Sequence, residues 1–259
     1  MLKPARQAAI LKAVTARGSC GVAELAQALD VSGETIRRDI KAMAEDGLVR
    51  KVHGGVRRPD LLRESDFHQR LGENAEAKRA IARRAAREVR DGDSLMLDTG
   101  STTAYVAQAL RDHRDLMVAT NSVDIARTLA TRNGNRVYMA GGELRADDGA
   151  ALGPAATTFI QQFRVRLAFL SIAAIDAEEG LMDYHLSEAE FSRVVMDRAE
   201  RTIIVADRSK FGSRALVRVA GFTAVDLLIT DAAPPEPFAE LLREAGVGVA
   251  TTEDGGATE

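Results

Sequence analysis

From residue 94 onward, short apolar runs alternate with amphipathic segments, and this alternation constrains the fold more than any other feature of the chain. Runs typical of buried strands lie at 94–98, 116–120, 136–140, 167–175, 202–206 and 226–230. Segments with helical spacing of apolar residues lie among them, at 102–110, 122–129, 157–163, 188–199 and 236–245. Strands that alternate with helices of this length predict a mostly parallel sheet with helices on both faces, which is a doubly wound α/β domain.

In such a sheet, ligands bind beyond the carboxyl ends of the strands, and here several strands are followed by small polar residues. Glycine allows close approach to the backbone, hydroxyls donate hydrogen bonds, and the N-terminus of a following helix attracts an anion. One such loop alone is compatible with a simple capped turn, but several at one edge predict a phosphate pocket. The candidate pocket residues are Asp98, Thr99, Gly100, Ser101, Thr102, Thr103, Thr120, Asn121, Ser122, Gly141, Gly142 and Lys210.

The first part of the chain has a different pattern, with helical spacing at 5–16, 22–29 and 32–46. Ser32 is suited to cap the third of these helices, and Ile36, Ile40 and Met43 recur at the spacing of one buried face. Residues 48–56 then read as a short hairpin. Three helices followed by a hairpin predict a winged helix-turn-helix domain at 1–57, a linker at 58–76 and a second domain at 77–252.

Charge supports a nucleic-acid partner for this first domain. Residues 1–58 hold 11 Lys and Arg against 6 Asp and Glu, although the whole chain has 35 against 38. Arginine and threonine near the start of a recognition helix can contact both phosphates and base edges. The alternative is that the arginines are solvated surface charges and that the histidine of the hairpin is incidental. The candidate DNA-binding residues are Ser32, Thr35, Arg37, Arg38, Lys41, Arg50, Lys51 and His53.

Several other classes of protein and site are disfavoured. Cys20 is the one cysteine and cannot form an internal disulfide, and no Cys/His cluster has zinc spacing. No apolar run reaches the ~18 residues of a membrane helix, and the N-terminus lacks the apolar region of a secretory signal. Neither G-x-G-x-x-G nor G-K-[ST] is present, which disfavours a dinucleotide or P-loop site. We therefore expect a cytoplasmic protein without a metal, a cofactor or a membrane partner.

Two stretches of the first domain carry a family resemblance. Residues 31–40 read V-S-G-E-T-I-R-R-D-I, and residues 47–55 read G-L-V-R-K-V-H-G-G. Both resemble the DNA-binding head of the DeoR family of bacterial transcriptional regulators, and the resemblance extends over nearly the whole chain. It implies double-stranded operator DNA as a partner and repression as the usual mode of action.

The second domain also resembles the fold of ribose-5-phosphate isomerase. T-G-S-T at 99–102 and D-x-S-K at 207–210 are similar to the phosphate-binding motifs of that enzyme. However, the segment 174–188 lacks the lysine and glycines that continue the enzyme's pattern. Asp176 and Glu188 remain as candidate bases and as further effector-binding residues. Isomerisation needs a positioned base and electrophilic assistance, so binding without turnover is the better interpretation.

Together, these resemblances imply a regulator that a phosphorylated sugar or polyol releases from its operator. Residues 141–145 and 230–232 are similar to members of the family that control glycerol 3-phosphate use, so this ester is a leading candidate effector. A homodimer or homotetramer is expected because each head reads one half-site. Two alternatives stay open: a sugar-phosphate isomerase-like enzyme with an accessory DNA-binding head, and a nucleic-acid-binding protein whose second domain only forms oligomers.

Overall fold

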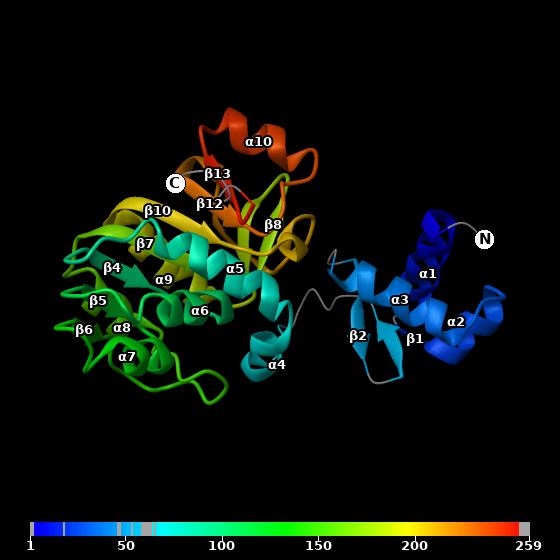
Figure 1. Cartoon of the computed structure of the whole chain (residues 1–259), viewed down its shortest axis with the longest axis horizontal. Coiled ribbons are helices and arrows are strands. Elements are labelled where there is room, and N and C mark those ends of the chain that lie inside the picture. The colour runs from blue at the N-terminus through cyan, green and yellow to red at the C-terminus, as the bar shows by residue number, and fades with distance from the viewer. Residues whose placement is uncertain are drawn as a thin grey trace.

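The computed structural model describes residues 3–17, 19–45, 48–52, 54–57, 64 and 66–253. Figure 1 shows a small N-terminal unit, here called the head, beside a larger α/β unit, here called the body. The head ends with the strand at Arg57, and the body begins with the helix at Phe67.

The head is a winged helix-turn-helix, as the sequence predicts. Its elements are α1 (Lys3–Arg17), β1 (Ser19–Gly21), α2 (Val22–Ala28), α3 (Gly33–Glu45), β2 (Arg50–Val52) and β3 (Gly55–Arg57). The three helices pack around one apolar cluster that contains Ile36, Ile40 and Met43 of α3, so the predicted inward face is confirmed. The wing has a third strand, β1, which was not predicted because Ser-Cys-Gly is too short to show a strand pattern; it pairs with β3.

A helix lies within the stretch predicted as a linker. Residues Phe67–Gly72 form α4, and α5 (Ala75–Ala86) follows almost at once. Phe67 is buried, and its backbone N–H donates to the carboxylate of Asp147 at 3.0 Å. The hydroxyl of Tyr105 donates to the carbonyl of Leu71 at 2.9 Å. These contacts attach α4 to the body.

A seven-stranded parallel sheet forms the centre of the body, in the order β13-β12-β10-β7-β4-β5-β6. The strands are β4 (Ser94–Leu97), β5 (Met117–Thr120), β6 (Arg136–Met139), β7 (Val165–Ser171), β10 (Ala199–Val205), β12 (Leu227–Thr230) and β13 (Gly248–Thr251). The predicted doubly wound α/β class is confirmed. Strand β13 was not predicted, because it is an edge strand with only Ala250 buried.

Alternating side chains of the strands supply two apolar layers, one on each face of the sheet. Leu95 and Leu97 pack with the layer under α5, α6 (Ser101–Ala109) and α7 (Val123–Leu129), whereas Met96 faces the opposite layer. Helices α8 (Pro154–Ile160), α9 (Leu186–Asp197) and α10 (Phe238–Glu244) cover that opposite layer. This alternation is the pattern expected of strands buried on both faces.

A second, three-stranded antiparallel sheet interrupts the alternation. It contains β8 (Ala174–Asp176), β9 (Gly180–Asp183) and β11 (Val217–Ala220) in the order β11-β9-β8. The predicted strand 167–175 is therefore two strands, which are separated after Ser171. Gly180 begins β9 with φ +80°, and a Cβ there would lie 2.5 Å from the carbonyl oxygen of Ala220, so the close pairing requires glycine.

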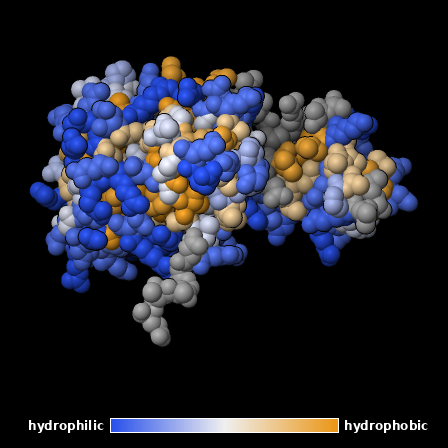
Figure 2. All heavy atoms as spheres, turned by 90° about the horizontal axis from the view of Figure 1, so that it is seen from above, coloured by the Kyte–Doolittle hydropathy of each residue, from blue (hydrophilic) through white to orange (hydrophobic). Residues whose placement is uncertain are grey.

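The distribution of residues on the surface is consistent with the burial of apolar side chains on both faces of the sheet. On the face shown in Figure 2, hydrophilic side chains cover most of the body, and hydrophobic ones form smaller patches between them. In the described part of the chain, no helix is both long and apolar enough to cross a membrane.

Candidate functional site

Helix α3 presents a row of polar and cationic side chains to solvent. The hydroxyl of Ser32 accepts a hydrogen bond from the N–H of Thr35 at 3.2 Å and so caps the helix, as predicted. The side chains of Arg37, Arg38 and Lys41 are 63%, 80% and 75% exposed. Their ion pairs with acidic neighbours on the same helix are 3.6 to 3.9 Å long. Exposed pairs of this length contribute little, so these cations are available to a polyanion.

The wing contributes cations with different surroundings. Lys51 is exposed, but Arg50 is half-buried, and its Nη2 donates to Oε1 of Gln69 on α4 at 3.1 Å. Arg50 therefore connects the wing to the body in this arrangement of the two units. His53, the remaining predicted wing residue, lies outside the described residues.

The carboxyl edge of the large sheet contains a cavity that brings together much of the predicted pocket. Residues from the loops after β4 and β5, from α9 and from the turn after β10 line it. Seven predicted effector residues contribute to this lining: Asp98, Thr99, Ser101, Thr102, Asn121, Glu188 and Lys210. The sheet topology explains this, because the carboxyl ends of parallel strands meet at one edge.

The loop 98–101 is held in place by its neighbours. The N–H of Thr99 donates to Oδ1 of Asn121 at 2.8 Å, and Asn121 donates in turn to the carbonyl of Ala151 at 3.2 Å. A Cβ on Gly100 would lie 2.8 Å from the Cβ of Ser171, so the loop can approach β7 only with glycine at this position. The N-terminus of α6 is thereby fixed at the cavity.

Other predicted residues support the cavity without lining it. The hydroxyl of Thr103 donates to the carbonyls of Asp98 and Gly100 at 3.0 and 3.1 Å. The hydroxyl of Thr120 accepts from the N–H of Ser122 at 3.1 Å. Ser122 caps α7 by accepting from the N–H of Ile125 at 3.4 Å. Their side-chain oxygens already have partners that fix the loops.

Three predicted effector residues lie away from the cavity lining. Gly141 and Gly142 are exposed in the loop after β6. Asp176 ends β8, where it accepts from the N–H groups of Glu178 and Glu179 and pairs with Arg214 at 2.6 Å. Burial opposes ionisation of Asp176, but these contacts outweigh it and lower its pKa. Its observed role is to close the turn between β8 and β9.

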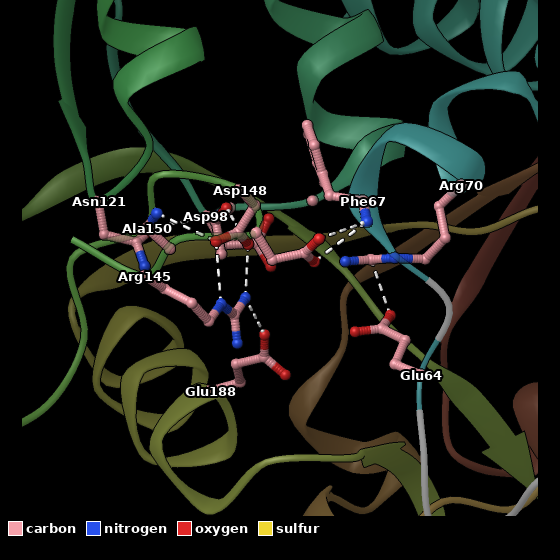
Figure 3. Close-up of polar contacts among 12 residues, drawn as sticks. Glu64, Phe67, Arg70, Asp98, Asn121, Arg145, Asp148, Ala150 and Glu188 are labelled. Carbon is pink, nitrogen blue, oxygen red and sulfur yellow. Dashed lines mark hydrogen bonds and ion pairs between the residues drawn. The ribbon is translucent and has the colours of Figure 1, made fainter.

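A network centred on Arg145 joins the loop after β6 to α9 (Figure 3). Nε of Arg145 donates to Oδ1 of Asp148 at 2.9 Å, and Nη2 lies 2.6 Å from Oε1 of Glu188. Burial opposes ionisation of Asp148, but the hydrogen bonds and charge of Arg145 outweigh it and lower the pKa of Asp148. The sequence prediction included Glu188 but missed Asp148, because nothing local to the sequence indicates that both carboxylates share one arginine.

The stretch before α5 also reaches the cavity. Glu64 and Arg70 line it and form an ion pair at 2.7 Å (Figure 3). Behind them, the buried Lys78 donates to the carbonyl of Arg70. Burial, and next the nearby charge of Lys210, lower the pKa of Lys78 to about 8. These residues lie in or beside the stretch predicted as a linker, so only the tertiary structure identifies them.

One group of side chains has the composition of a metal site. Ligand atoms of Glu64, His185 and Glu188 all lie within 4.8 Å of one another. Both carboxylates are already paired with arginines, Glu64 with Arg70 and Glu188 with Arg145. These ion pairs compensate both carboxylates without a metal ion.

Comparisons with known proteins agree with this division into two units. Residues 6–61 match the DeoR-like helix-turn-helix domain, and residues 73–232 match the DeoR C-terminal sensor domain. The glycerol-3-phosphate regulon repressor of Escherichia coli (strain K12) is 34% identical over 94% of this chain and 97% of that protein. The repressor of the same name from Haemophilus influenzae is 38% identical over 94% and 95%. Ribose 5-phosphate isomerase A from Methanocaldococcus jannaschii matches 54% of this chain and 55% of that chain, with a TM-score of 0.39 and 18% identity.

Proposed function

This chain belongs to the DeoR family of transcriptional regulators, and we propose that it is a repressor whose operator binding is relieved by a phosphorylated sugar or polyol. The head binds the operator through α3 and the wing, and the body binds the effector in the cavity at the sheet edge. The two curated relatives described above are named for glycerol 3-phosphate, which makes this ester the first effector to test.

The observation that carries the effector proposal is the position of Lys210. It is the only lysine from residue 79 onward, and it lines the same cavity as Ser101 and Thr102 at the start of α6. A lysine, two hydroxyls and the N–H groups of a helix N-terminus form a suitable set of donors for a phosphate ester.

The cavity is less suited to isomerisation than to binding. Glu188 is the predicted base that lines it, and Arg145 already holds this carboxylate at 2.6 Å. The second candidate base, Asp176, closes a turn and is paired with Arg214. Abstraction of a proton next to a carbonyl requires a free base within reach of the substrate. This arrangement favours a regulator that binds its effector without converting it.

The turn that carries Lys210 also reaches the head. Residues Arg208–Lys210 form a short 3-10 turn, η1, and Nη2 of Arg208 lies 4.0 Å from Oε2 of Glu45 at the end of α3. An effector that moves Lys210 would thus change the surroundings of the recognition helix. Release follows if the effector binds the DNA-incompetent arrangement more tightly, because only a difference in affinity shifts such an equilibrium.

Operator binding also requires more than one head. Two copies with heads about one helical turn of DNA apart, ~34 Å or a multiple, read two half-sites at once. We therefore propose a homodimer or homotetramer as the DNA-binding form.

The proposal is tested by measuring operator affinity with and without candidate esters. An operator is first selected from random duplexes, and its affinity is then measured with glycerol 3-phosphate, ribose 5-phosphate or glucose 6-phosphate, each beside its unphosphorylated parent. We expect at least one ester to release the operator and raise the melting temperature, and the parents to do neither. If no ester does either, the effector proposal is wrong; turnover of an ester would restore the enzyme interpretation.

A further inference from the structure

One carboxyl group in the cavity has few partners. Asp183 ends β9, lines the cavity and is only 8% exposed. The N–H of Ala173 donates to its Oδ1 at 3.2 Å. Within the described part of the chain, Asp183 has no ion pair and no second hydrogen bond. A carboxylate offers about four acceptor positions, so most of its capacity is unused.

The other carboxyl groups of the cavity are compensated by the protein itself. Arg145 pairs with Asp148 and Glu188, and Glu64 pairs with Arg70. Asp98 accepts from the N–H and the hydroxyl of Ser171. Among the carboxyl groups of the lining, Asp183 therefore differs in having, within the described residues, one backbone N–H as its donor and no arginine or hydroxyl beside it.

The surroundings of Asp183 make this lack of donors costly. Burial raises its pKa well above the ordinary value, and the nearby carboxyls of Glu188, Glu64 and Asp98 raise it further. Buried polar groups are normally hydrogen-bonded, and those that are not usually have a functional reason. A donor from a ligand in the cavity would satisfy Asp183.

Lys210 is the complementary group of the same lining. It forms no ion pair within 4.0 Å among the described residues, and it lines the cavity together with Asp183, whose one described donor is a backbone N–H. A ligand with a phosphate at one end and a hydrogen-bond donor elsewhere would satisfy both groups.

Building on the proposed function, we infer that Asp183 determines effector specificity by accepting hydrogen bonds from a hydroxyl or ammonium group on the effector, away from its phosphate. The cavity then selects phosphate esters that carry such donors over simple alkyl phosphates. Lys210 contributes affinity for every phosphate ester, whereas Asp183 contributes only for those that have a donor to offer.

Titration calorimetry with a series of esters tests this assignment. The probes are n-propyl phosphate, glycerol 3-phosphate, ribose 5-phosphate, glucose 6-phosphate and glucosamine 6-phosphate; the first has no donor besides its phosphate, and the last carries an ammonium group. The best donor-bearing ester should bind roughly ten- to hundredfold more tightly than n-propyl phosphate, which is the range for leaving a buried acceptor without its hydrogen bond. A comparison of glucose 6-phosphate with glucosamine 6-phosphate distinguishes a hydroxyl donor from an ammonium donor.

The variant Asp183→Asn keeps the shape of the side chain and an acceptor for the N–H of Ala173. It should weaken the donor-bearing ester roughly tenfold or more and leave n-propyl phosphate unchanged, whereas Lys210→Ala should weaken both. The control Asp112→Asn changes an exposed carboxylate far from the cavity lining and should alter neither.

The proposed sensor function and the role of Asp183 can be disproved separately. If n-propyl phosphate binds wild-type protein as tightly as every polyol ester, or if Asp183→Asn weakens both classes equally, the role of Asp183 is wrong and the sensor function stands. If no phosphate ester binds at all, the proposed function fails together with the inference. The wild-type series can still overturn the role of Asp183 even if Asp183→Asn does not fold.

Discussion

On α3 of the head, Arg37 and Arg38 lie 3.6 and 3.7 Å from Glu34 and are mostly exposed, whereas in the body Arg145 lies 2.6 Å from Glu188 and also pairs with the buried Asp148. Long, exposed pairs contribute little and exchange easily for a phosphate. Short pairs with buried carboxylates are costly to break, because a buried charge is left uncompensated. The cations of α3 are thus available for binding, whereas Arg70 and Arg145 are engaged by carboxylates that line the cavity.

The largest effect is expected from removing the exposed arginines of α3. Arg37→Ala/Arg38→Ala should weaken operator binding by about 1–3 kcal/mol for each base-reading contact that is lost. A gel shift with specific and random duplexes measures this change. The matched control Arg111→Ala/Arg114→Ala removes two exposed arginines of the body and should leave affinity unchanged. Wild-type affinity in the α3 variant would mean that another surface reads the DNA.

The next effect concerns Lys78, a buried cation without an ion partner of its own in the described structure. Its pKa falls from 10.5 to about 8, so between these values the unfolded chain binds more protons than the folded one. The free energy of unfolding should therefore rise with pH across this window. The rise is about 3 kcal/mol if the pKa of Lys78 differs by this full amount between the unfolded and folded states.

Lys78→Met isolates this contribution, because methionine keeps much of the buried chain without the charge. Urea denaturation of both proteins at several values between pH 7 and 10.5 should show a smaller rise for the variant. Parallel pH curves for the two proteins would contradict the lowered pKa of Lys78.

A somewhat smaller effect is expected from Lys210→Ala. Loss of a charge-assisted hydrogen bond should cost about 1.5–3 kcal/mol of effector affinity, whereas operator affinity without effector should stay near the wild-type value. Titration of operator release measures both quantities, and Ser101→Ala should show a milder loss because a neutral hydroxyl contributes less. An unchanged release midpoint in Lys210→Ala would remove this lysine from the site, and loss of DNA binding without effector would indicate misfolding.

The head and the large sheet were predictable because their apolar residues repeat at the period of the local element. Ile36, Ile40 and Met43 mark one face of a helix, and the buried strands form continuous apolar runs. The small antiparallel sheet was missed because β8 and β9 are short, and their separation from β7 depends on pairing with β11. Helix α4 was missed because a single aromatic residue, Phe67, anchors it.

The same distinction applies to the candidate site: local sequence patterns predicted some of its residues, and residues that reach it through distant packing were missed. The loops at 98–102 and 120–122 contain glycine, hydroxyl and amide groups directly after strands, so the sequence predicts them. Asp183 and Glu64 reach the cavity only through β9 and the stretch before α4. Asp176 was predicted as a pocket residue on its chemistry, but the turn between β8 and β9 places it outside the lining. A residue whose place in the site depends on packing between distant segments cannot be identified from the residues next to it in the sequence.

The smallest effect tests whether the two units are coupled through η1. Arg208 is 4.0 Å from Glu45 and about half exposed, so the pair should contribute less than about 1 kcal/mol to operator affinity in the absence of effector. Its importance would lie in transmitting effector binding from the cavity to α3. Arg208 is two residues from Lys210, and its N–H donates to Asp231 at 2.7 Å. Arg208→Ala and Glu45→Gln should each reduce the factor by which effector lowers operator affinity, and the double variant should reduce it no further. Additive losses in this double-mutant cycle would show that the two residues act independently and that the signal reaches α3 by another route.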